Sequence, residues 1–152
     1  MKRTILRLIG IILLLSCQAK AQDDFLSVKS SYSVKVTVEK LSNVLSEKGM
    51  TIFSIIDHQK GAVGAGLELR PTTVVIFGNP KVGTKLMECD QKAGLDLPLK
   101  IVIWEDTGGG TWLGYTDPLS LKRKYDLKSC SEVILKVKNA MASFAKAATL
   151  QP

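Results

Sequence analysis

A run of three glycines between two apolar segments constrains the fold of this chain more than any other feature. Residues 106–110 read Asp-Thr-Gly-Gly-Gly, and they connect the β-branched segment 99–105 to the segment 111–115. Clustered glycines supply the positive φ angles that a tight turn needs. We therefore predict that the two segments pair as an antiparallel hairpin, which counts against a doubly wound parallel sheet, the second-ranked architecture.

Three more segments have the pattern of a strand. Residues 31–38 alternate between apolar and polar side chains, as a half-buried strand does. Residues 50–57 and 72–77 are rich in β-branched and aromatic side chains. The glycine-rich segment 58–67 between them is interpreted as a turn or a short helical excursion.

Helical signals follow these strands. Thr37 is expected to cap a first helix, and a second helix begins either just after Asn79 or at Thr84. Asp117 precedes a proline, a pair that is typical of a short helix start. The motif Ser-x-x-Glu at 129–132 is typical of a capping box, and it predicts a last helix of about four turns. Together these elements predict an α+β, two-layer domain with a mainly antiparallel sheet of about five strands and helices packed on one face.

The first 21 residues have the three parts of a secretory signal peptide. A basic stretch within residues 1–7 precedes the apolar run 8–15, and a small-x-small cleavage site lies at 19–21. The apolar run is shorter than the roughly 20 residues that span a membrane. We expect a signal peptide at 1–21, a flexible lead-in at 22–30 and a single domain at 31–150.

A second processing route uses the segment Leu-Leu-Ser-Cys at 14–17, which resembles a bacterial lipobox. In that route Cys17 would be lipidated and become the first residue of the mature protein. Cleavage after Ala21 fits the sequence better. We therefore expect a soluble periplasmic or secreted protein, with a lipid anchor in the cell envelope as the alternative, and a membrane is a partner only if Cys17 is lipidated.

Removal of the leader on export would remove most of the chain's net positive charge. Four of the 21 basic residues and none of the 14 acidic residues lie in the leader, which leaves 17 basic against 14 acidic residues, a net charge of +3. The mature part has a single basic run, Lys-Arg-Lys at 122–124, which is typical of a solvated helix face. Nucleic-acid binding requires a clustered basic surface, so we expect no nucleic acid as a partner.

Cleavage after Ala21 leaves two cysteines, Cys89 and Cys130. An oxidising compartment permits a disulfide between them, but bonding requires Cα atoms within about 7 Å. Cys89 falls on the apolar side of a predicted helix, where a free thiol behaves as a small hydrophobe. We expect two unpaired structural cysteines. No metal-ligand spacing occurs, so we expect no metal and no cofactor.

His58 is the sole histidine and the most direct candidate for catalysis. It follows a predicted strand, a position where side chains often line a pocket, and histidine suits proton transfer near neutral pH. The chain has no Gly-x-Ser-x-Gly nucleophile elbow, and the glycine pattern at 61–66 lacks the order of a nucleotide-binding loop. A histidine that hydrogen-bonds a neighbouring loop is therefore the favoured interpretation.

Acidic and aromatic residues gather near the predicted hairpin, namely Asp96, Glu105, Asp106 and Asp117 with Trp104, Trp112 and Tyr115. Paired carboxylates beside aromatic rings could bind a sugar or cleave a glycosidic bond. However, Asp106 suits a turn and Asp117 suits a helix cap, which favours structural roles. Glu68 and Arg70 lie two residues apart, and we expect them to pair with each other rather than with a ligand carboxylate.

Several segments together resemble the family called domain of unknown function 302. They cover residues from about 32 to 127, and they are Ile56-Asp57-His58, Gly66-Leu67-Glu68-Leu69-Arg70-Pro71-Thr72, Ile76-Phe77-Gly78-Asn79-Pro80-Lys81, Gly83-Thr84, Gly94-Leu95-Asp96-Leu97-Pro98-Leu99-Lys100, Trp104-Glu105-Asp106 and Tyr115-x-Asp117-Pro118.

The resemblance implies a TATA-box-binding-protein-like α+β fold, with a curved antiparallel sheet backed by helices, and a homodimer. It implies no catalytic activity, and the name of the fold does not bring DNA binding with it. It identifies ligand-binding candidates by their motif positions, which are His58, Glu68, Arg70, Asn79, Asp96, Trp104, Glu105, Asp106, Tyr115 and Asp117.

Two functions remain as hypotheses. The first is a non-enzymatic, homodimeric domain of the cell envelope that binds an unidentified small molecule or a partner. In it, Trp104, Tyr115 and Arg70 would line the concave side of the sheet, with His58 at its rim. The second is a hydrolase or isomerase that uses His58 with Asp96 or Glu105 as acid and base, which requires these side chains to converge within about 3 Å or through one water.

Overall fold

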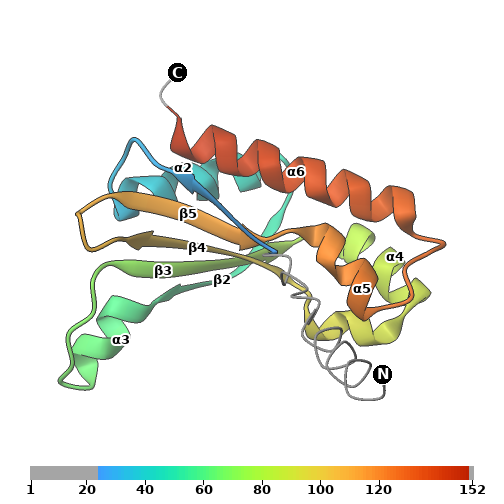
Figure 1. Cartoon of the computed structure of the whole chain (residues 1–152), viewed down its shortest axis with the longest axis horizontal. Coiled ribbons are helices and arrows are strands. Elements are labelled where there is room, and N and C mark those ends of the chain that lie inside the picture. The colour runs from blue at the N-terminus through green and yellow to red at the C-terminus, as the bar shows by residue number, and fades with distance from the viewer. Residues whose placement is uncertain (1–23, 151–152) are drawn as a thin grey trace, which may run out of the picture.

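The computed structural model describes residues 24–150, which form one five-stranded antiparallel sheet with helices packed on it (Figure 1). The strand order is β1-β5-β4-β3-β2, and every neighbouring pair is antiparallel. This is the α+β fold that the sequence predicts, and it contradicts the doubly wound parallel alternative. The strands are β1 (Phe25–Lys29), β2 (Thr51–Asp57), β3 (Thr72–Gly78), β4 (Leu99–Glu105) and β5 (Thr111–Thr116).

Two long helices, α2 (Val34–Glu47) and α6 (Ser131–Thr149), lie side by side on one face of the sheet (Figure 1). At the end where β3 stops and β4 starts, called here the helical end, lie α4 (Pro80–Cys89), η1 (Gln91–Leu95), η2 (Pro118–Ser120) and α5 (Leu121–Lys124). The opposite end, called here the hairpin end, carries the β4–β5 turn and α3 (His58–Gly64).

The hydrophobic core lies between the sheet and the two long helices. Side chains alternate across a strand, so every second residue of β3, β4 and β5 faces the helices. Those inward residues are buried together with one stripe of each helix. The core includes Val75, Phe77, Ile101, Ile103 and Leu113 from the strands, and Leu41, Leu45, Ile134, Met141 and Phe144 from the helices.

The prediction of a strand at 31–38 is wrong, because this segment begins α2. Ser33, not Thr37, caps the helix, and its side chain accepts a hydrogen bond from the Val36 backbone N–H. Thr37 lies inside the helix and is fully buried, and its hydroxyl is 2.7 Å from that of Ser30. The buried stripe of the helix, with spacings of three and four residues, prevails over the two-residue alternation that the sequence also shows.

The first strand lies in the segment that we expected to be a flexible lead-in. β1 runs from Phe25 to Lys29 and pairs with β5, from Phe25 opposite Thr116 to Lys29 opposite Trp112. The ordered domain therefore includes residues before position 31. The signal peptide and the lipobox at Cys17 lie outside the described residues.

Four local predictions can be compared with the structure. Asn79 caps α4, so that helix begins at the earlier of the two expected positions, and Asp117 caps η2 as expected. The hairpin turn is confirmed, with Gly109 at a φ of 77°. The prediction of a capping box at 129–132 is wrong, because α6 begins at Ser131 and no side chain caps its first turn.

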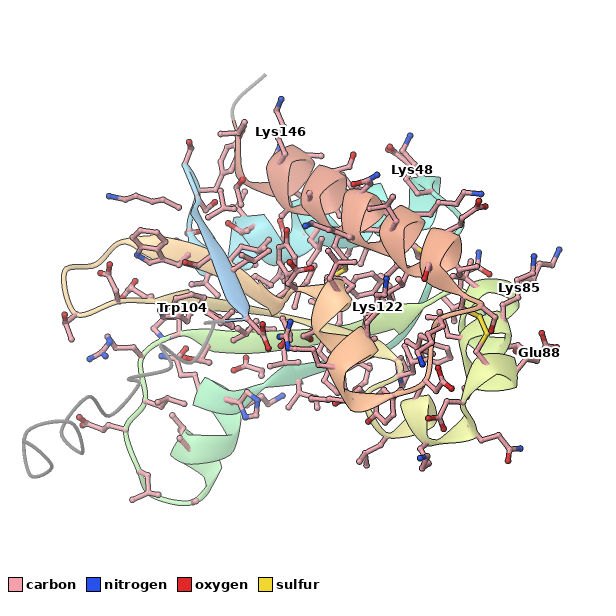
Figure 2. All side chains as sticks on the ribbon, turned by 45° about the vertical axis from the view of Figure 1, so that its right-hand side comes forward. Lys48, Lys85, Glu88, Trp104, Lys122 and Lys146 are labelled. Carbon is pink, nitrogen blue, oxygen red and sulfur yellow. A yellow bond between two sulfur atoms is a disulfide. The ribbon has the colours of Figure 1, made fainter. Side chains whose placement is uncertain are left out.

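The cysteines that we expected to be unpaired form a disulfide. Cys89 ends α4 and Cys130 directly precedes α6, and their Cα atoms lie 6.5 Å apart (Figure 2). The approach of two elements that are distant in the sequence brings the thiols together. Across residues 24–150, no helix has both the length and the apolar character needed to cross a bilayer.

Candidate functional site

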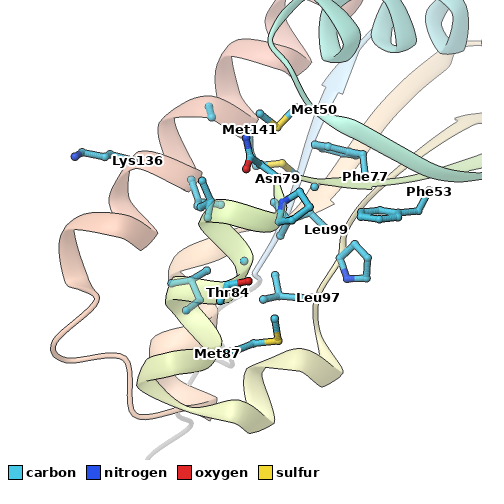
Figure 3. A pocket seen from close by; sticks show the side chains of 18 of the residues that line it. Met50, Phe53, Phe77, Asn79, Thr84, Met87, Leu97, Leu99, Lys136 and Met141 are labelled. Carbon is cyan, nitrogen blue, oxygen red and sulfur yellow. The ribbon is translucent and has the colours of Figure 1, made fainter.

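An apolar cavity of about 430 Å³ opens at the helical end of the sheet, between α4 and α6 (Figure 3). The strands contribute Phe77 and Leu99 to its wall, and α6 contributes Met141. Phe53 lies at its edge and is 53% exposed. The cavity therefore reaches from solvent to side chains of the hydrophobic core.

A bulge in β2 positions Phe53. The pairing register between β2 and β3 shifts between Ile52 and Ser54, so Phe53 has no direct partner in the ladder. Its ring lies beside Gly78, where a Cβ would be 3.6 Å from the ring atom Cε2. A Cβ at this distance would make ordinary van der Waals contact, so the ring packs directly against the strand at Gly78.

Local sequence holds α4 at both ends while leaving space beside it. Asn79 accepts a hydrogen bond from the Lys81 backbone N–H at 3.0 Å, and Pro80 occupies the first turn. The disulfide at Cys89 ties the other end of the helix to the start of α6. Gly83 faces the cavity, and a Cβ there would meet only Leu97 Cδ1, at 4.0 Å.

The cavity offers few polar groups. Lys136 is the single titratable residue in its lining, and Figure 3 shows its ammonium group pointing away from the space. Asn79 and Thr84 supply the remaining polar side chains, and the Asn79 oxygen already serves as the cap of α4. The cavity can therefore bury an apolar group, and its lining holds no acid and base pair.

The ten candidate residues do not surround one pocket. His58, Glu68, Arg70, Glu105 and Asp106 lie at the hairpin end, where β2 stops, β3 starts and β4 stops. Candidates at the helical end are Asn79, Asp96 and Asp117, and those on the sheet itself are Trp104 and Tyr115. Of the ten, Asn79 alone lines the apolar cavity.

His58 is the exposed first residue of α3. Asp57 caps that helix by accepting a hydrogen bond from the Lys60 backbone N–H at 2.9 Å. In the described range, no hydrogen bond or ion pair joins His58 to Asp96 or to Glu105. The whole length of β4 separates Asp96 from the end of the sheet that carries His58.

Glu68 and Arg70 are both exposed, and the ion pair that we expected between them is not formed. Arg70 instead donates a hydrogen bond from Nε to the backbone carbonyl of Glu105, at 3.2 Å. The Glu105 backbone N–H in turn donates to the Pro71 carbonyl at 3.0 Å. Arg70 therefore joins the loop before β3 to the end of β4.

Asp106 organises the hairpin turn, as its turn-like sequence context suggests. Its carboxylate accepts hydrogen bonds from the backbone N–H groups of Gly108 and Gly110, each at 2.8 Å, and from the Trp112 indole at 2.7 Å. The indole hydrogen bond and the N–H of Gly110 hold the pKa of Asp106 below its usual range. Both carboxylate oxygens of Asp106 therefore accept hydrogen bonds that hold the hairpin turn.

Trp104 and Tyr115 lie on opposite faces of the sheet, so they cannot line one concave surface as we expected. Tyr115 is 6% exposed on the face that the helices cover, and burial together with the charge of Asp117 raises its pKa. Trp104 lies on the other face, where its ring stacks on Trp112 with centroids 6.5 Å apart and a tilt of 21°. Phe25 is the next ring, 5.9 Å from Trp104.

Asp96 lies in a second, smaller pocket at the helical end. Its Oδ2 accepts a hydrogen bond from the Tyr125 hydroxyl at 2.9 Å and another from the Lys124 ammonium at 3.1 Å. Burial raises the pKa of Asp96, but these two donors outweigh it and the pKa falls below its usual range. The described residues include no cluster of three or more histidine, cysteine or carboxylate side chains that could hold a metal ion.

The apolar cavity was missed by reasoning from the sequence. The helical spacing of Val82 and Leu86 is visible there, but such spacing is typical of any core helix. Nothing in the sequence signals that Phe53 leaves the strand ladder or that α6 crosses beside α4. The cavity arises from the way distant elements meet.

The family model described as "Domain of unknown function DUF302" matches residues 26–144. The chain is also similar to a solved structure, that of an uncharacterized conserved DUF302 protein from Bacillus stearothermophilus. The TM-score is 0.76 at 19% sequence identity, over 83% of this chain and 98% of the other. At that identity the likeness supports the fold alone.

Two curated relatives resemble this chain over part of their own length. The fluoride-specific ion channel FluC 1 of Brucella suis biovar 1 (strain 1330) is 42% identical over 110 residues, which are 72% of this chain and 43% of the relative. The fluoride-specific ion channel FluC 2 of Brucella melitensis biotype 1 (strain ATCC 23456 / CCUG 17765 / NCTC 10094 / 16M) is 42% identical over 110 residues, which are 72% of this chain and 41% of the relative. The chain thus spans less than half the length of these relatives.

Proposed function

This chain belongs to the family described as domain of unknown function DUF302, and we propose that its domain is a non-enzymatic protein that binds an apolar or amphiphilic small molecule. The observation that carries the proposal is the cavity of about 430 Å³ between α4 and α6. Ligand pockets commonly measure about 300–1,000 Å³ and are lined mainly by apolar side chains. The cavity meets both conditions.

The lining suits an apolar chain of variable shape. Met50, Met87 and Met141 all contribute, and methionine side chains adapt to irregular ligands because they are unbranched and flexible. Phe53 would lose exposed surface when a ligand enters. Burial of each additional methylene contributes about 0.8 kcal/mol. Affinity should therefore rise roughly fourfold per methylene until the cavity is full.

Calorimetric titration of the purified protein with octan-1-ol, decan-1-ol and dodecan-1-ol tests this proposal. The variant Ala140→Trp places an indole in the cavity and should abolish binding, because Ala140 lines it on α6. The matched control is Ala142→Trp, since Ala142 is exposed on the same helix and lies outside the lining. Absence of binding by all three alcohols, or equal binding by a folded Ala140→Trp variant, would contradict the proposal.

We further propose that the domain acts outside the cytoplasm, after cleavage of the leader behind Ala21. The disulfide between Cys89 and Cys130 supports this proposal, because structural disulfides persist in oxidising compartments. The mass of the protein recovered from the producing cell would identify the mature N-terminus. A mature chain that starts at a lipidated Cys17 would place the domain on a membrane instead.

Self-association is proposed for the surface formed by β2 and α3. β2 is an edge strand and exposes Ile55 at 48%, and α3 exposes Val63 at 66%. Leu67, in the loop after α3, is 65% exposed. Large apolar side chains that remain exposed on an edge strand and on the elements beside it are candidates for a contact site. Sedimentation equilibrium should show a dimer that Val63→Lys dissociates, whereas Leu135→Lys, at an exposed leucine of α6, should not. A monomer at high concentration would contradict this.

A further inference from the structure

A polar pocket of about 140 Å³ adjoins the apolar cavity at the helical end of the sheet. The side chains of Leu99 and Met141 line both spaces. Met141 is 1% exposed, and its flexible side chain can take other rotamers. The two pockets are therefore separated by side chains, one of which can move without any change in the backbone.

The polar pocket contains a buried hydroxyl without a partner. Ser120 is 2% exposed and lines the pocket, and its Oγ has no hydrogen-bond partner among residues 24–150. Buried hydroxyl groups are nearly always hydrogen-bonded. A turn of the Ser120 side chain about its Cα–Cβ bond would bring the hydroxyl to a ligand atom in this pocket, which could accept the hydrogen bond that Ser120 leaves unmade.

The charges around the pocket leave one cation in excess. Asp96 is paired with Lys124 at 3.1 Å, and Asp117 lies 3.6 Å from the ammonium of Lys138. Lys100 also lines the pocket. Within the described residues it forms no ion pair within 4 Å and donates to the Pro98 carbonyl at 3.2 Å, although its charge also helps to lower the pKa of Asp96.

We propose that this pocket receives the carboxylate of a single-chain amphiphile whose apolar chain lies in the cavity. The inference rests on the proposed function and adds the class of ligand, a long-chain carboxylate. With Lys138 counted beside Asp117, three ammonium groups stand against two carboxylates, so one further negative charge would balance them. The unpartnered hydroxyl of Ser120 would supply a donor to the same head group. The small volume of the pocket fits a head group of a few atoms.

Calorimetric titration with dodecanoate and dodecan-1-ol, both below their aggregation limits, separates the head group from the chain. Dodecanoate should bind the purified protein about tenfold more tightly than the alcohol. Lys100→Met and Ser120→Ala should each weaken dodecanoate binding by about tenfold and leave dodecan-1-ol binding unchanged. The matched control is Lys122→Met, because Lys122 is exposed on α5 and lies outside the pocket.

Each outcome has a definite meaning. Equal affinity for the two ligands, or unchanged dodecanoate binding by Lys100→Met and Ser120→Ala, would overturn the inference while the cavity proposal stands. Tighter binding of dodecyltrimethylammonium than of dodecanoate would also overturn it. Failure of both dodecanoate and dodecan-1-ol to bind would overturn the cavity proposal and, with it, this inference. Loss of both ligands in Ala140→Trp would confirm that their chains share the cavity.

Discussion

Cys89 and Cys130 are joined by a disulfide that ties the end of α4 to the residue before α6, across a sequence separation of 41 residues. These two helices form facing walls of the apolar cavity. In the structure, the bond is thus a covalent limit on how far the walls can separate. A chain with this arrangement should depend on the disulfide both for stability and for the shape of the cavity.

Removal of the disulfide is expected to lower the free energy of unfolding. A loop of this length corresponds to roughly 4 kcal/mol in the chain-entropy account of cross-links. The variant Cys89→Ala/Cys130→Ala should therefore unfold at a lower urea concentration than the oxidised protein. A reducing agent should destabilise the wild-type protein and leave this double variant unaffected. Two free thiols in the purified, unreduced protein would contradict the prediction.

The hydroxyl pair of Ser30 and Thr37 should stabilise the junction between β1 and α2. Thr37 is fully buried, its Oγ1 lies 2.7 Å from Ser30 Oγ, and it also donates to the Ser33 carbonyl at 2.9 Å. Thr37→Val keeps the shape and removes the hydroxyl, so it should cost about 1–2 kcal/mol in urea unfolding.

A double-mutant cycle with Ser30→Ala tests whether the two hydroxyls act as a pair. The double variant should lose less free energy than the two single variants combined, because each single variant already removes the shared hydrogen bond. Additive losses would show that Ser30 and Thr37 contribute independently of each other.

Asp106 should make the stability of the hairpin depend on pH. The Trp112 indole and the Gly110 N–H hold its pKa below the roughly 3.9 of an unfolded aspartate. A carboxyl whose pKa is lower in the folded state stabilises that state above the unfolded pKa. The contribution is lost as the pH falls through the folded pKa. Asp106→Asn should therefore lower the melting temperature at pH 7 and make a smaller difference near pH 3.

Thermal unfolding at pH 7 and near pH 3 tests whether the Asp106 carboxylate stabilises the protein more at the higher pH. Asp126→Asn is a suitable control, because the Asp126 side chain makes no hydrogen bond or ion pair in the described range. Its effect on the melting temperature should be small at both pH values. A larger effect of Asp106→Asn in acid than at neutral pH would show that Trp112 and Gly110 do not favour the ionised carboxylate.

The segment at 31–38 shows why sequence patterns identified most of the sheet but not its first strand. Val34 belongs both to a two-residue alternation and to the helical series that continues through Thr37 and Leu41. The cap at Ser33 and the core beneath the sheet select the helix. β1 carries only five residues, mostly exposed on an edge, so its own pattern is weak. The hairpin turn, by contrast, depends on local glycine chemistry and was predictable.

The apolar cavity could not be predicted in the same way, because no local sequence motif encodes it. The residues with motif-like character, such as Asp106 and Asn79, prove to cap or close turns. The cavity instead depends on a bulge at Phe53 and on the crossing of α4 and α6, which are long-range features. Sequence motifs consist largely of charged and polar residues, whereas the residues that line an apolar cavity have the same pattern as ordinary core residues.

Gly83 offers a test of the idea that the chain keeps open space beside α4. Glycine inside a helix costs about 0.5–1 kcal/mol relative to alanine. A Cβ at Gly83 would meet only Leu97 Cδ1, at 4.0 Å, so Gly83→Ala should raise the free energy of unfolding by about that amount. The added methyl group would project toward the cavity and should weaken the binding of dodecan-1-ol.

Gly61→Ala is the matched control for this variant. Gly61 also lies inside a helix, α3, and a Cβ there would meet nothing within 4 Å. It should stabilise the protein by a similar amount and leave dodecan-1-ol binding unchanged, since α3 lies at the hairpin end, away from the cavity. If Gly83→Ala stabilises the protein and binds the alcohol as tightly as the Gly61→Ala variant does, the ligand does not occupy the space beside α4.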